Sequence, residues 1–91
     1  MTQRWGDDVA QAIARRVQQL EAVERLEQMR HLPGNCHELV ADRAGQLAVS
    51  ATGSVRLIFE PDHNPVPTKP DGGLDWIAVD AITIVEVVDY H

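Results

Sequence analysis

The stretch QLAVSATGSVRLIFE, residues 46–60, decides the fold. Apolar residues recur at every second position in both of its halves, at Leu47, Val49 and Ala51 and then at Val55, Leu57 and Phe59. Such alternation is typical of β-strands with one buried face. Thr52-Gly53 lies between the halves and indicates a tight turn, although it is a weaker hairpin signal than Asn-Gly. We therefore predict an antiparallel hairpin whose second strand carries Arg56 on the face opposite to Phe59.

Residues 7–31, before the hairpin, are predicted to be helical. Apolar residues follow one another at spacings of four and three, the pattern of a buried helical stripe: Val9, Ile13, Val17 and Leu20. Pro33-Gly34 ends the helical region. We expect a break near residues 22–24 and hence a helix pair, but nothing in that segment forbids one continuous helix.

The remaining segments complete an α+β domain. Residues 36–40 predict a short strand, and residues 61–75, with four prolines and two glycines, predict a structureless connector. A single helical turn is expected at 76–79. The last strand, 81–89, is apolar on both faces, which favours a central position in the sheet. The chain of 91 residues is thus expected to form one domain, 1–91, with helices packed on an antiparallel sheet of about four strands built from 36–60 and 81–89.

Composition restricts the classes of function. Cys36 is the single cysteine, so no internal disulfide is expected, and a reducing cytoplasmic setting is the default. No stretch approaches the roughly 20 apolar residues of a membrane span, so no membrane association is expected. Residues 31–91 hold three basic and nine acidic groups and account for the whole net charge of −6. This balance argues against broad, non-specific affinity for nucleic acid, which depends on Lys and Arg.

An ordered set of short motifs resembles the RelE/ParE toxin superfamily, in particular its HigB-like members. The motifs are Leu32-Pro33-Gly34-Asn35-Cys36-His37-Glu38-Leu39, Asp42-Arg43-Ala44-Gly45-Gln46-Leu47, Arg56-Leu57-Ile58-Phe59-Glu60-Pro61 and the closing Asp89-Tyr90-His91. The resemblance covers roughly residues 4–91. It implies the toxin of a type II toxin–antitoxin pair, of the kind called a "killer" protein of plasmid maintenance. Such a toxin cuts mRNA in the ribosome without a metal ion, by attack of a 2′-hydroxyl on the adjacent phosphodiester.

The resemblance also implies a cognate antitoxin, of helix-turn-helix type, and the ribosome with its mRNA as partners. Two departures from the family pattern stand out. The opening strand and short helix of the family have no counterpart, which would leave a sheet edge unpaired and favour a homodimer across that edge. Val40 stands where these toxins tend to place a lysine. A non-catalytic protein of the same fold, which binds an antitoxin or itself, is therefore the alternative function.

Asp89, Tyr90 and His91 are the first candidates for chemistry. Cleavage of this kind requires a base, an acid and cations around the phosphate. His91 is the first choice for proton transfer because imidazole suits both proton roles, and the alternative is a frayed terminal residue. Asp89 would orient His91 or His37, unless it is a solvated acid at a strand end. Tyr90 would stack on a base or bind phosphate, unless it is a half-buried aromatic at the rim.

Three further candidates lie earlier in the chain. His37, on the first short strand, would approach the end of the last strand, and the alternative is a structural histidine. Arg56 is the best phosphate clamp, with an ion pair to Glu60 or Asp89 as the alternative. Arg43, in a turn, is predicted to be a solvated residue first and a substrate contact second.

No metal, cofactor or cysteine chemistry is predicted. Cys36 and His37 are neighbours on a strand, so their side chains point to opposite faces and do not form a nucleophile–base pair. Asp62, His63 and Asp71 have no recognised metal-ligand spacing.

Overall fold

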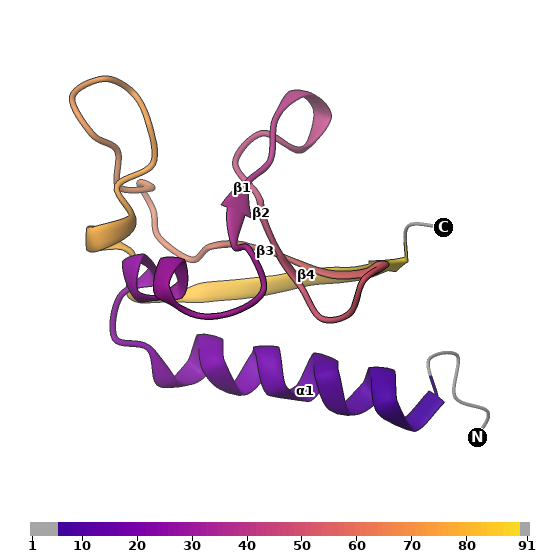
Figure 1. The fold of residues 1–91 in the computed structure, drawn as a ribbon. Helices are drawn as coiled ribbons and strands as arrows, with labels where there is room; N and C mark the ends of the chain where they lie inside the picture. The colour runs from indigo at the N-terminus through magenta and orange to yellow at the C-terminus, as the bar shows by residue number, and fades with distance from the viewer. Residues whose placement is uncertain (1–5, 90–91) are drawn as a thin grey trace.

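In the computed structural model, which describes residues 6–89, one α-helix packs against a four-stranded antiparallel sheet (Figure 1). The helix is α1 (Gly6–Ala22), and the strands are β1 (His37–Glu38), β2 (Leu47–Ser50), β3 (Val55–Pro61) and β4 (Ile82–Asp89). Three short 3₁₀ helices connect them: η1 (Leu26–His31), η2 (Ala41–Arg43) and η3 (Trp76–Ala78). The predicted α+β class is confirmed.

The helical region breaks where the sequence suggested. α1 ends at Ala22, and η1 begins at Leu26. The side-chain oxygen of Gln28 accepts hydrogen bonds from the backbone N–H groups of Glu24 and Arg25, which satisfies donors at the start of η1. The N–H of Leu26 donates to the carbonyl of Val79 at 2.8 Å. The break therefore turns the chain back toward η3.

The last strand occupies an edge of the sheet, and the predicted central position is wrong. The strand order is β1-β2-β3-β4, so β4 pairs only with β3 among the described residues. Its apolar faces remain partly open: Ile84 is 40% and Val85 39% exposed. Apolar residues on both faces fit an open edge strand as well as a central one, which is why the pattern misled.

A bulge in β4 also changes which residues share a face. Ile58 pairs with Glu86 and the next residue, Phe59, pairs with Ile84, so Val85 is an extra residue in β4. Beyond the bulge, Val87 pairs with the buried Leu57. Strict alternation would place Val87 on the face opposite to Ile84, whereas the structure places both on the side of the sheet that faces α1.

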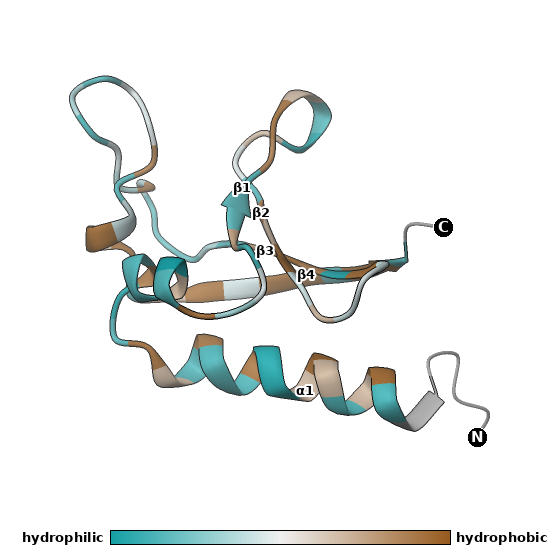
Figure 2. Ribbon diagram, in the orientation of Figure 1, coloured by the Kyte–Doolittle hydropathy of each residue, from teal (hydrophilic) through white to brown (hydrophobic). Residues whose placement is uncertain are grey.

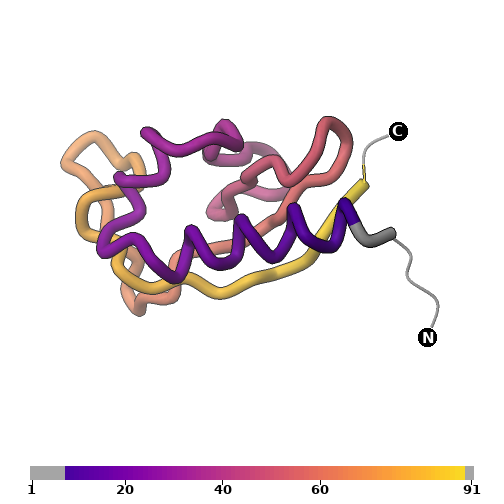
Figure 3. Tube along the Cα trace, turned by 60° about the horizontal axis from the view of Figure 1, so that its bottom comes forward, coloured from indigo at the N-terminus to yellow at the C-terminus, as the bar shows by residue number. Residues whose placement is uncertain are grey.

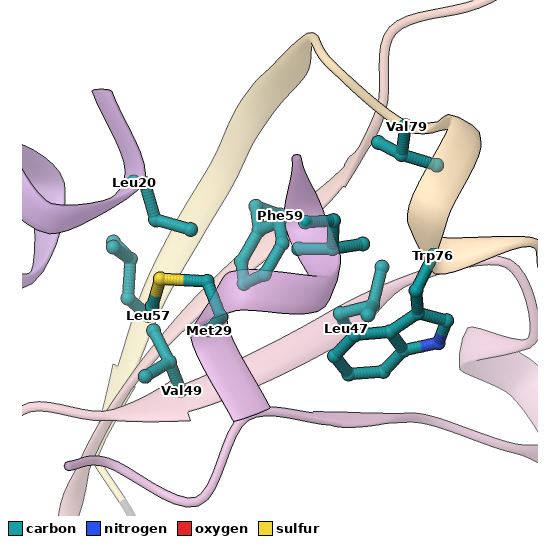
Figure 4. Close-up of a cluster of buried hydrophobic side chains, with 9 residues drawn as sticks. Leu20, Met29, Leu47, Val49, Leu57, Phe59, Trp76 and Val79 are labelled. Atoms are coloured by element: carbon teal, nitrogen blue, oxygen red, sulfur yellow. The ribbon is translucent and has the colours of Figure 1, made fainter. Parts of the chain in front are cut away.

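The hydrophobic core fills the space between this side of the sheet and the helices (Figure 4). Its buried members are Leu20, Leu26, Met29, Leu47, Val49, Leu57, Phe59, Trp76 and Val79. Hydrophobic segments of α1 are turned toward the sheet, while polar segments face away (Figure 2). Trp76 also donates from Nε1 to a carboxylate oxygen of Glu38 at 3.0 Å, and the Arg30 guanidinium lies 3.8 Å from its ring centroid. The core thus joins η3 to β1 and η1.

Gly34, in the turn before β1, lies in close contact with α1 and β2. Its φ is +116°, and a Cβ built there would lie 2.6 Å from Cγ2 of Val49 and 3.0 Å from Nε of Arg16. The Gly34 carbonyl accepts from the N–H of Ser50 at 2.7 Å, while Arg16 Nε donates to the Ser50 carbonyl at 2.7 Å. Only glycine combines this backbone conformation with so close an approach.

The connector 61–75 has more order than expected. Thr68 and Leu74 form an isolated antiparallel bridge, and the N–H of Lys69 donates to the carbonyl of Gly73 at 2.7 Å. The predicted helical turn after it is present as η3. No helix in the described part of the chain is long and apolar enough to cross a membrane.

Candidate functional site

The sheet face turned away from α1, here called the outer face, carries two of the predicted site residues. Paired residues of neighbouring strands share a face. His37 pairs with Ala48, and Ala48 with Ile58, while Arg56 pairs with Ser50. Arg56 and Ile58 are two apart on β3, so His37 and Arg56 belong to the same face. From strand spacing and rise, their Cα atoms are about 12 Å apart.

His37 is exposed and held by the backbone next to it. Its Nδ1 lies 2.7 Å from the carbonyl oxygen of Asn35. A carbonyl only accepts, so Nδ1 carries the hydrogen and Nε2 of the neutral ring becomes the proton acceptor. Asn35 has a φ of +52°, in the left-handed region that Asn tolerates. The turn at residues 34–35 therefore presents His37 as a base with a defined tautomer.

Arg56 is partly buried on the outer face, near the end of the sheet that carries the β2–β3 turn. Its NH1 donates to the carbonyl of Gly53 at 3.3 Å, which draws the guanidinium toward the β2–β3 turn. Its strand partner in β4 is Val88. Arg56 thus lies beside Val88, which directly precedes Asp89, the last residue that the structure describes.

Asp89 lies on the other side of the sheet. It pairs with Val55, a buried residue of the face that packs on α1. The strand pairing places the Cα atoms of Asp89 and His37 about 18 Å apart, because the two residues are three strands apart across the sheet and offset by three residues along the strands. The structure therefore does not bring Asp89 to His37, and the Asn35 carbonyl takes the orienting role that had been considered for Asp89.

Arg43 crosses the outer face and pairs with Glu86 of β4. Its NH1 also donates to Oε1 of Gln46 at 2.9 Å. Ile58 and Ala48, which share the outer face with Glu86, are 0% and 2% exposed. Arg43 is thus a paired residue that spans the sheet, in contrast to the predicted solvated turn residue.

Tyr90 and His91 lie outside the described residues. They follow Asp89 directly in the sequence, and their proposed roles remain predictions. Two residues that matter to the site were missed by the sequence reasoning: Asn35 and Glu86. Glu86 could have been found only by pairing acidic with basic residues across the sheet, and such pairing requires the strand register.

Cys36 is poorly suited to nucleophilic chemistry. Burial raises the pKa of its thiol to about 12, and the nearby Arg30 cation opposes this only in part. A thiol with so high a pKa holds almost no thiolate at neutral pH. Within residues 6–89, no three His, Cys, Asp or Glu side chains gather as a metal site would require.

A pocket of about 350 Å³ lies away from the outer face, between the end of α1 and the start of β4. Apolar side chains form most of its wall: Val17, Leu20, Val23, Leu26, Ile82 and Ile84. It had no counterpart among the sequence predictions, because it depends on β4 being an edge strand.

Comparison with known proteins gives no relative: no family model, no curated protein and no solved structure matches this chain.

Proposed function

We propose that this protein is a RelE/ParE-like toxin of a type II toxin–antitoxin pair and a ribosome-dependent, metal-independent mRNA endoribonuclease. The observation that carries the proposal is the joint placement of His37 and Arg56 on the outer face, with the His37 tautomer set by Asn35. The resemblance of the sequence motifs supplies the class of substrate. A cognate antitoxin of helix-turn-helix type would neutralise the toxin.

The proposed reaction follows from these two groups. Nε2 of His37 takes the proton of a 2′-hydroxyl, whose oxygen attacks the adjacent phosphorus. The bond from phosphorus to the 5′-oxygen breaks, and that oxygen receives a proton from an acid, for which His91 is the proposal. The products are a 2′,3′-cyclic phosphate and a 5′-hydroxyl. Arg56 stabilises the negative charge of the phosphorane.

The distance between the two groups suits one phosphodiester. A Cα separation of about 12 Å leaves room for an arginine and a histidine side chain to reach toward a nucleotide between them. Such a site gives positioning as well as charge, which is how an acidic protein would act on RNA with few cations. The ribosome would supply most of the affinity for the message.

A non-catalytic protein of the same fold is the second candidate. Two observations favour it: Asp89 lies on the face opposite to Arg56, and Arg43 is engaged by Glu86. Binding of an antitoxin, or self-association, would then be the whole function.

The test is cleavage of a defined mRNA by purified protein added to translating ribosomes, with the cut sites and end groups mapped. We expect cleavage that falls at least 100-fold in His37→Ala and in Arg56→Ala, as is typical when a general base or a charge-stabilising group is removed. His31→Ala, which removes an exposed histidine of η1, is the matched control and should cleave normally. Folded wild-type protein that cuts nothing would support the second candidate, and cleavage indifferent to both variants would reject the proposed site.

A further inference from the structure

β4 is a long strand whose second side has no strand partner within residues 6–89. The strand spans eight residues, Ile82–Asp89, and seven of them pair with β3, its one partner among the described residues. Soluble proteins usually protect such an edge with short length, prolines, lysines or bulges, and of these β4 has only the bulge at Val85. The strand remains largely hydrophobic along its length (Figure 2), so this edge is suited to backbone pairing with another chain.

The pocket between α1 and β4 runs along the same edge. α1 lies alongside β4 both in the ribbon view of Figure 1 and in the turned view of Figure 3. Val17 and Leu20 of α1 face Ile82 and Ile84 of β4 across the pocket. A strand that paired with β4 would direct alternate side chains toward α1, because successive side chains of a strand point to opposite faces. Those side chains would enter the pocket, so backbone and side-chain recognition coincide there.

The charges around this surface select the partner. Glu21 and Asp80 line the pocket, whereas Glu86 of β4 is already paired with Arg43 on the outer face. The nearby Arg25 is shared with Asp80 at 3.6 Å. A second copy of the chain, itself at −6, would bring the same carboxylates to the edge and repel. A segment carrying lysine or arginine at its ends would be attracted.

We infer that the β4 edge and the adjoining pocket bind an extended segment of a different protein, apolar at alternate positions and flanked by basic residues, which adds to the sheet as a fifth strand. The pocket lies on the opposite side of the sheet from His37, and Arg56 adjoins β4 through its strand partner Val88. The inference therefore stands whether or not the protein cleaves RNA.

The test uses the isotope-labelled full chain and a synthetic peptide of about nine residues, the usual length range of a strand, with valine at alternate positions, threonine between them and lysine at both ends. Titration followed by NMR should shift the amide signals of β4 and of Leu20 and Val23. Ile84→Ser should weaken binding at least fivefold, and Ile77→Ser, which alters an exposed residue of η3 outside the pocket, should leave it unchanged.

Three results would overturn the inference. Equal binding of a peptide with glutamate in place of lysine would remove the charge argument. Signal changes elsewhere than β4 would remove the site. Light scattering that gives a dimer which Ile84→Ser dissociates would assign the edge to a second copy.

Discussion

Replacement of Gly34 by alanine tests how tightly α1, β2 and the turn before β1 are joined. A non-glycine residue at a φ of +116° costs about 1–3 kcal/mol in backbone strain. The new Cβ would lie 2.6 Å from Cγ2 of Val49, a fully buried side chain that cannot move aside, and overpacking of this kind costs a further ~1–3 kcal/mol. We therefore expect Gly34→Ala to lose about 2–6 kcal/mol, a large share of the roughly 5–10 kcal/mol that a domain of this size has.

Gly45→Ala is the matched control for this experiment. Gly45 has a comparable φ of +93°, but a Cβ there would meet nothing within 4 Å. Its loss should be the strain alone, about 1–2 kcal/mol. Urea unfolding followed by circular dichroism gives both values, with equal m-values as the check on two-state behaviour. Equal losses in the two variants would refute the close contact with Val49. Removal of that contact by Val49→Ala should also make the Gly34→Ala loss smaller in the double variant.

Three further predictions concern the core and its rim. Alkylation of Cys36 by iodoacetamide at pH 8 should be at least 100-fold slower in the native protein than in 6 M guanidinium, since the pKa of the buried thiol is raised to about 12, and equal rates would contradict the burial. Because the unfolded thiol loses its proton at a lower pH than the folded one, this group lowers the free energy of unfolding as pH rises from about 9 to 12. Met29→Ala should cost about 2–5 kcal/mol in urea unfolding, because the side chain is 0% exposed in the middle of the core, and a loss below about 1 kcal/mol would be inconsistent with that packing. Trp76→Phe should cost about 1–3 kcal/mol through the lost hydrogen bond to Glu38 and the smaller ring, and the effect should shrink in a Glu38→Gln background if that bond is its cause.

The elements of the fold and their α+β packing were largely predictable, but the position of the last strand was not. Alternation in residues 46–60 gave both hairpin strands, and the stripe from Val9 to Leu20 gave α1. The position of the last strand depended on what lies beside it, and residue types alone do not encode this. An apolar strand has the same sequence pattern whether a neighbouring strand or solvent lies at its side.

The candidate site was likewise predictable in part: the face of Arg56 could be predicted, but that of Asp89 could not. The alternation in β3 placed Arg56 opposite to Phe59, and the structure agrees. The face of Asp89 depended on one residue, because the bulge at Val85 shifts every later residue of β4 by one position. Without that bulge, Asp89 would share the outer face with Arg56. Bulges carry no reliable sequence signal, so the separation of Asp89 from Arg56 and His37 could not be predicted from the sequence.

The connector 61–75 is fastened at its base by the Thr68–Leu74 bridge and, just beyond it, by the Trp76 contacts with Glu38 and Arg30. Its tip, near Pro70 and Asp71, is exposed and carries no core side chain. Peptide tags or fluorescent labels inserted between these two residues would therefore add length without disturbing the sheet. The molecule offers a natural attachment point that leaves both the outer face and the β4 edge open for assays.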